Sequence, residues 1–70
     1  MREIPFALST EFIELYKLLK ATGLCESGGA AKHAISQGEV KVDGVVELRK
    51  ARKILKGQSV AFEGQIILAK

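Results

Sequence analysis

The sequence has few of the residues on which metal, disulfide and membrane sites depend. A single cysteine, Cys25, excludes an internal disulfide, and with only His33 beside it the chain offers too few soft ligands for structural zinc. No apolar run approaches the roughly 18 to 20 residues that a membrane-spanning helix needs. We therefore expect no metal, no cofactor and no membrane segment.

Catalytic side chains are equally scarce. A nucleophilic Cys25 needs a base and an orienting partner, and His33 is the only histidine in the chain. No pair of acids has a spacing that implies a shared catalytic site, and no serine-histidine-aspartate arrangement can be assembled. We predict no enzymatic activity and no small-molecule substrate, and we interpret Cys25 as a small buried apolar residue.

The composition is that of one folded domain. The chain has 70 residues, of which 47% are apolar and 27% charged, with one proline and no low-complexity tract. A chain of this length buries only roughly 60% of its unfolded surface, so we expect a single domain over residues 1–70. The first five residues include an acid and a proline where a signal peptide needs an apolar segment, which predicts a cytoplasmic protein.

Positive charge is concentrated late in the chain. The formal net charge is +3, yet residues 1–26 and 27–47 each carry one more acid than base, and residues 48–70 carry six bases and one acid. Five of the eleven lysines and arginines lie between Arg49 and Lys56, with no acid among them. Such a segment attracts a polyanion.

Apolar residues at helical spacing predict two helices in the first half of the chain. Ser9 or Thr10 is the expected cap of the first, which ends at Gly23. Ser27 is the expected cap of the second, which ends at Gly38. In the first predicted helix, Glu11 and Glu14 lie in the first turn, where the helix dipole favours negative charge. Its apolar stripe consists of Phe12, Leu15, Tyr16 and Leu19.

The second half of the chain predicts strands. Asp43-Gly44 between two valine-rich runs, 40–42 and 45–46, is a strong signal for a hairpin with a type I′ turn. Residues 59–63 and 65–68 predict two more strands around Gly64. We expect an α+β fold in which two N-terminal helices pack on a small antiparallel sheet with a β-hairpin.

Two constellations are candidate anion sites. Lysine and arginine side chains after the hairpin neutralise phosphates and release counterions, or they form a solvated loop that only aids solubility. Ser27-Gly28-Gly29 at a helix start offers backbone N–H groups to an anion, or it is a tight turn that closes the helix pair. The candidate residues are Arg49, Lys50, Arg52, Lys53 and the Ser27-Gly28-Gly29 segment, with Lys32 and His33 on the polar face of the second helix and Lys41 in the hairpin.

The segment Leu15 to Phe62, with its run SGGAAKHAISQGEVKVDGVVELRKARKI, resembles the S-four RNA-binding domain, and in particular the small stand-alone bacterial group of YbcJ-like proteins. The resemblance implies a bent, L-like arrangement of helices and hairpin, the alpha-L motif. It also implies an RNA surface built from the start of the second helix and the exit of the hairpin, and a first helix that begins nearer Glu14, with Phe12 and Ile13 extended. Gly28 departs from the arginine that many larger members carry there.

Three hypotheses follow for function. The first is a monomeric protein that binds structured RNA, double-helical or ribosomal, through phosphate and 2′-hydroxyl contacts. The second is an adaptor whose basic loop meets an acidic protein. The third is an RNA-anchoring subunit of an RNA-modifying enzyme. Salt-resistant binding of protein without RNA would favour the second, and a stably co-purifying enzyme would favour the third.

Overall fold

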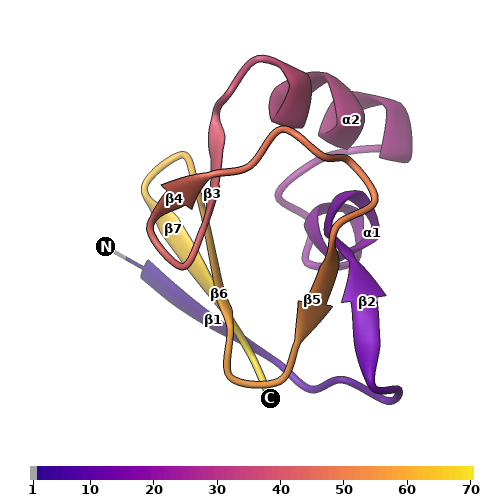
Figure 1. The fold of residues 1–70 in the computed structure, drawn as a ribbon, viewed down its shortest axis with the longest axis vertical. Helices are drawn as coiled ribbons and strands as arrows, with labels where there is room; N and C mark the ends of the chain where they lie inside the picture. Colours follow the sequence, from indigo (N-terminus) through magenta and orange to yellow (C-terminus); the bar gives the residue numbers. More distant parts are fainter. Residues whose placement is uncertain (1) are drawn as a thin grey trace.

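A computed structural model describes residues 2–70, which form two helices and two sheets (Figure 1). The larger sheet has five strands in the order β1-β7-β6-β3-β4, and the smaller one pairs β2 with β5. The elements are β1 (Arg2–Phe6), β2 (Phe12–Glu14), α1 (Leu15–Ala21), α2 (Gly28–Ser36), β3 (Val40–Val42), β4 (Val45–Val46), β5 (Lys53–Leu55), β6 (Ser59–Phe62) and β7 (Gln65–Ala69).

Both predicted hairpins are present, and their turns have the expected chemistry. Asp43 and Gly44 have φ angles of 51° and 84°, so both central residues of the first turn are left-handed, as a type I′ turn requires. Glu63 and Gly64 repeat this conformation between β6 and β7. The Asp43 carboxylate also accepts a hydrogen bond of 2.8 Å from the Ser59 N–H, so the first turn is fixed to the start of β6.

The prediction that the helices come first and that the sheet is antiparallel is wrong in two respects. β1 precedes both helices and pairs in parallel with β7, with Ile4 opposite Ile67, so the larger sheet is mixed. The alternation of apolar residues in β1 is short, and its partner lies at the other end of the sequence. Local pattern therefore carried little information about this pairing.

The first helix starts later than its apolar spacing predicts. Phe12–Glu14 is a strand antiparallel to Lys53–Leu55, and α1 begins only at Leu15, so neither Ser9 nor Thr10 caps it. The later start that the family resemblance implied is confirmed. Cross-strand pairing decides the outcome, since Ile13 packs opposite Ile54 and gains a buried partner that a helix would not give it.

The second helix follows its capping signals. Ser27 Oγ accepts a hydrogen bond of 3.1 Å from the Ala30 N–H at the start of α2, and Gly38 follows its last turn with a φ angle of 77°. Cys25, just before α2, is buried as expected, and burial raises the pKa of its thiol.

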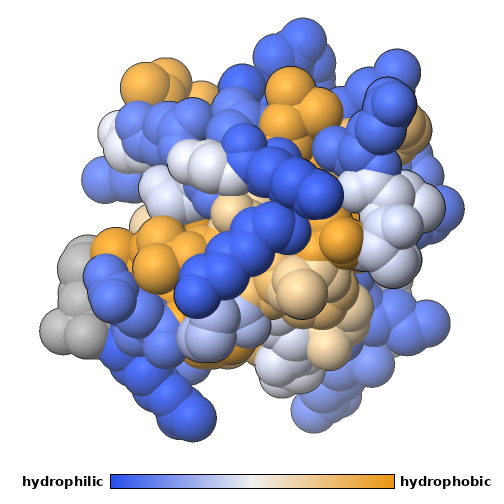
Figure 2. Space-filling model, turned by 90° about the horizontal axis from the view of Figure 1, so that it is seen from below, coloured by the Kyte–Doolittle hydropathy of each residue, from blue (hydrophilic) through white to orange (hydrophobic). Residues whose placement is uncertain are grey.

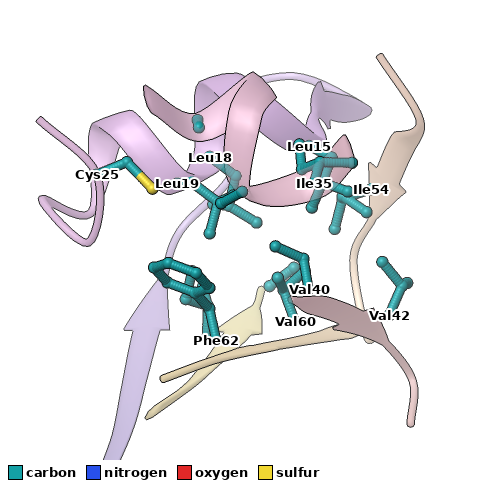
Figure 3. Packing of buried hydrophobic residues seen from close by; sticks show 14 residues of the cluster. Leu15, Leu18, Leu19, Cys25, Ile35, Val40, Val42, Ile54, Val60 and Phe62 are labelled. Carbon is teal, nitrogen blue, oxygen red and sulfur yellow. The ribbon is translucent and has the colours of Figure 1, made fainter. Parts of the chain in front are cut away.

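The core lies between the two helices and one face of the larger sheet (Figure 3). Leucines of α1 and Ile35 of α2 point toward strand residues Val40, Val60 and Phe62. The fully buried large side chains are Leu15, Leu18, Leu19, Ile35, Val40, Ile54, Val60 and Ile67. Within residues 2–70, no helix is long and apolar enough to cross a membrane, and no three His, Cys, Asp or Glu side chains gather where they could hold a metal ion.

Candidate nucleic-acid interface

Residues 47–53, which run from the end of β4 to the first residue of β5, are called the basic loop. Its backbone carbonyls accept hydrogen bonds from the first N–H groups of α1, a helix that has no side-chain cap. The Leu15 N–H donates to the Arg52 carbonyl over 2.8 Å, and the Tyr16 N–H donates to the Lys50 carbonyl over 3.1 Å. The first N–H groups of a helix lack partners within the helix. These two bonds give partners to two such groups of α1 and fix the loop at the same time.

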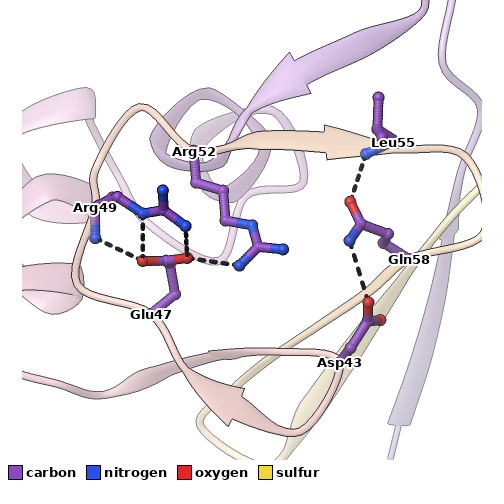
Figure 4. A network of polar contacts seen from close by, with 6 residues as sticks. All are labelled: Asp43, Glu47, Arg49, Arg52, Leu55 and Gln58. Atoms are coloured by element: carbon purple, nitrogen blue, oxygen red, sulfur yellow. Dashed lines mark hydrogen bonds and ion pairs between the residues drawn. The ribbon is translucent and has the colours of Figure 1, made fainter.

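The Glu47 carboxylate accepts hydrogen bonds from both arginines of the basic loop (Figure 4). Its Oε2 accepts from the Arg49 N–H at 3.0 Å and from Arg49 Nε at 3.2 Å, and its Oε1 accepts from Arg52 Nη1 at 2.7 Å. The Glu47 side chain is 9% exposed. Hydrogen bonds from Arg49, then from Arg52, lower the pKa of Glu47 to about 2, so the carboxylate stays ionised at neutral pH.

This arrangement corrects the interpretation of the basic segment as free of acid. Residues 49–53 contain no acid, but folding places Glu47, which precedes them in the chain, against two of their four cationic side chains. A guanidinium has five N–H donors, and the carboxylate takes two from the Arg49 side chain and one from Arg52. Both arginines therefore keep donors for a second anion, in an orientation that is already set.

The remaining cations of the loop are exposed. Lys50 and Lys53 lie at the surface, and an open pocket is lined by Arg49, Ala51, Arg52 and Lys53. Lys53 Nζ lies 4.8 Å from the centre of the Phe12 ring on the neighbouring strand. The loop thus presents positive charge around a concave surface.

Tyr16 connects this loop to α2. Its ring lies under Lys32, with Nζ 4.7 Å from the ring centre, while its backbone N–H is bonded to the Lys50 carbonyl. A Cβ built at Gly28 would meet the same ring at 3.6 Å, an ordinary van der Waals distance, so packing does not require glycine there. One aromatic residue therefore joins the predicted helix position Lys32 to the basic loop.

The other predicted residues take different places. His33 is exposed on α2, and Gly29 is exposed beside Ser27, in the first turn of the helix. Lys41 is exposed in β3 between two buried valines and opposite Ala61 of β6, so it lies on the outer face of the sheet rather than in the loop.

Sequence reasoning missed Glu47, Tyr16 and Phe12 as parts of this surface. Tyr16 was assigned to the core and Phe12 to a helix, and only the fold brings their rings to lysines distant in sequence. A signal for Glu47 does exist, because Arg49 and Arg52 follow it within five residues, but in sequence an acid at the end of a hairpin is an ordinary surface residue.

Comparison with known proteins finds a matching family model and similar sequences. The model of the S4 domain matches residues 6–69. The chain is 54% identical over 55 residues to YbcJ of Escherichia coli strain K12, covering 79% of each chain. It is 38% identical over 60 residues to a protein of Bacillus subtilis strain 168 named as the probable ribosome maturation protein RlbA, covering 86% of this chain and 84% of that one.

A solved structure is similar as well. The solution structure of YbcJ from E. coli, described as revealing an alpha-L motif involved in RNA binding, superposes with a TM-score of 0.71 at 48% sequence identity. The match covers 93% of this chain and 84% of that one. The likeness therefore extends over both helices and both sheets.

Proposed function

Because the chain belongs to the S4 domain family, we propose that it is an RNA-binding protein, without catalytic residues of its own, whose basic loop and Lys32 hold the phosphates of structured RNA. The relative YbcJ is described as having a motif involved in RNA binding, which supports the ligand class. The chemistry of the surface supports the mode, since lysines and arginines in a concave arrangement neutralise phosphates.

One observation carries the proposal. The carbonyls of Lys50 and Arg52 accept the first N–H groups of α1, and the ring of Tyr16, from the same helical turn, supports Lys32 of α2. This connection through Tyr16 supports the proposal that cations from two segments distant in sequence act as one surface. Such a surface spans neighbouring phosphates of a helix better than a flexible charged tail does.

Glu47 determines how the arginines act within this surface. A guanidinium that is already oriented loses less side-chain freedom when it binds a phosphate, which favours ligands whose phosphates match its direction. A-form RNA presents phosphates and 2′-hydroxyls across a wide, shallow groove. We therefore propose recognition by shape, with little readout of base edges.

Ribosomal RNA is the ligand that we favour. The relative from B. subtilis carries a name that refers to ribosome maturation, and its 38% identity extends over most of this chain. Ribosomal RNA is rich in short duplexes with irregular ends, which suits a binding surface of this small size. A cross-linking experiment in cells, followed by sequencing of the bound RNA, tests this choice directly.

The binding mode is tested by a competition assay between RNA and DNA duplexes of matched length at fixed salt. We expect the RNA duplex to bind more tightly, with a slope of log K against log salt of roughly −3 to −4 if about four phosphates are contacted. Backbone amide shifts should appear both near Lys32 and in the basic loop. Preference for DNA, or shifts in only one of the two regions, contradicts the joint surface.

Charge reversal locates the surface. The double change Lys50→Glu and Lys53→Glu leaves the Glu47 network intact and should abolish RNA binding while thermal unfolding stays cooperative. The matched control is Arg2→Glu with Lys70→Glu, two exposed residues on β1 and just after β7 that alter the net charge equally. Equal losses in both double variants would show that only overall charge matters.

A further inference from the structure

An apolar pair is exposed beside the basic loop. Phe12 and Leu55 are directly opposite each other in the β2-β5 ladder, and their side chains are on its outer face. The next pair, Ile13 and Ile54, faces the core. Phe12 is 36% exposed and Leu55 49% exposed. They lie at the lower end of the ladder in Figure 1, where β2 begins and β5 ends.

The surface on this side is mixed rather than polar throughout. Viewed from below, the molecule shows apolar side chains between groups of hydrophilic ones (Figure 2). Phe12 is the first residue of β2 and its partner Leu55 is the last residue of β5, so the ladder does not continue beyond this pair.

Lys53 links this pair to the phosphate surface. It is on the same face of β5 as Leu55, diagonal to Phe12, and its Nζ lies 4.8 Å from the centre of the Phe12 ring. Lys53 also lines the open pocket with Arg49 and Arg52. One side chain thus contacts both the aromatic ring and the cationic concavity.

We propose that Phe12 is a stacking site for one unpaired nucleobase of the RNA held by the basic loop, and that Lys53 moves from the ring to the adjoining phosphate when the base stacks. This inference rests on the proposed function and adds a subsite to it. The bound RNA would then be a duplex flanked by a bulge, loop or overhang, with the duplex on the basic loop and the unpaired nucleotide on Phe12.

Charge and shape favour this occupant over an apolar protein segment. A nucleotide combines a flat base with an anionic phosphate, and Phe12 with Lys53 offers the matching ring and cation at diagonal positions on one face of the ladder. A stacked base contributes more than the exposed cation–π contact that it replaces, so the exchange at Phe12 is favourable. An apolar peptide would cover the ring but would offer no anion to Lys53 or to the donors that Arg49 and Arg52 keep beyond Glu47.

The test compares two RNAs, a blunt duplex and the same duplex with one unpaired 2-aminopurine nucleotide at a bulge. The wild-type protein should bind the bulged RNA more tightly and quench its fluorescence. Phe12→Leu should reduce affinity for the bulged RNA by about 5- to 150-fold and remove the quenching, while affinity for the blunt duplex is unchanged. Phe12→Tyr should retain both properties.

Val45→Ala is the matched control, because Val45 is also apolar and 69% exposed but lies in β4, outside the basic loop. Quenching by the wild-type protein is measured without any substitution, so it tests the site even where a variant folds poorly. Absence of quenching, or equal losses for both RNAs in Phe12→Leu, overturns the stacking site while RNA binding stands. Failure of the wild-type protein to bind either RNA overturns the proposed function itself.

Discussion

The larger sheet and the basic loop are stabilised by different interactions. Apolar side chains pack the inner face of the sheet against two helices, and strand residues such as Val60 and Ile67 are fully buried. The basic loop has a single buried charged residue, Glu47, and is fixed by its hydrogen bonds and by two backbone bonds to α1. The sheet therefore depends on packing, and the loop depends on charge.

This difference suits a surface that meets a polyanion. A packed apolar core tolerates changes in pH and salt, because the burial of apolar surface does not depend on charge. A loop ordered by a carboxylate among guanidinium groups keeps its cations oriented, and the same carboxylate limits the net positive charge. A single carboxylate therefore sets both the orientation of the arginines and the net charge of the loop.

The largest expected effect is in the sheet. Ile67→Ala removes a fully buried side chain from β7 and should lower the free energy of unfolding by about 2–5 kcal/mol. For a domain of this size the total is only roughly 4–10 kcal/mol, so the variant should be close to unfolding at room temperature. Denaturant titration measures the loss, and Leu48→Ala, at an exposed position, should stay within about 0.5 kcal/mol of the wild type.

The second largest effect should arise in the basic loop and leave the structure of the sheet unchanged. Glu47→Gln keeps the shape of the side chain but removes its charge, so Arg49 and Arg52 lose charge-assisted bonds, and stability should fall by about 1–2 kcal/mol. Hydrogen exchange should quicken at the amides of Arg49, Leu15 and Tyr16, while that of the sheet changes only by the global loss.

The same variant gives a functional result that simple loss of structure does not. One negative charge fewer should strengthen binding to DNA and RNA duplexes alike and steepen the salt dependence, while the ratio of RNA to DNA affinity falls because the arginines are less well oriented. An unchanged ratio would mean that Glu47 orders the loop without contributing to discrimination.

Features that depend on neighbouring residues were predictable from the sequence. Asp43-Gly44 forms its turn because the backbone angles suit those two residues, and Ser27 caps α2 because its acceptor lies three residues from the donor. Phe12–Glu14 has helical apolar spacing yet forms a strand, because its partner Lys53–Leu55 is distant in sequence and provides the hydrogen bonds and the buried contact. Tertiary pairing prevailed over periodicity there.

The site was predictable in part for the same reason. The basic segment is visible in the sequence, because lysine and arginine are recognisable wherever they lie. The pairing of Glu47 with Arg49 and Arg52 cannot be read from the sequence, since the direction of a carboxylate depends on how the loop folds back. The role of Tyr16 likewise depends on the packing of α1 beside α2, which places its ring under Lys32.

Acid should loosen the loop before the core. Bonds from Arg49 and Arg52 lower the pKa of Glu47 from an ordinary 4.5 to about 2, so the stability that the carboxylate provides is complete above pH 4.5 and is lost as the pH falls toward 2. The amide signal of Arg49 should titrate in that window. Asp43 also has a lowered pKa, because it accepts a hydrogen bond from the Ser59 N–H. Glu47→Gln separates the two carboxylates. If the shift at Arg49 persists in this variant, the titration belongs to Asp43.

The smallest effects belong to the start of α2, where structure and binding separate most cleanly. Ser27→Ala removes the acceptor of the Ala30 N–H and should cost about 1 kcal/mol of stability as a lost cap. A Cβ at Gly29 has no closer neighbour than Ser27 Oγ at 3.8 Å, so Gly29→Val should stay folded while its side chain crowds the N–H groups of the first turn. If those groups bind a phosphate, Gly29→Val weakens RNA binding at nearly unchanged melting temperature, and Ser27→Ala does the reverse. Normal RNA binding by folded Gly29→Val would leave the segment as a tight turn that joins the two helices.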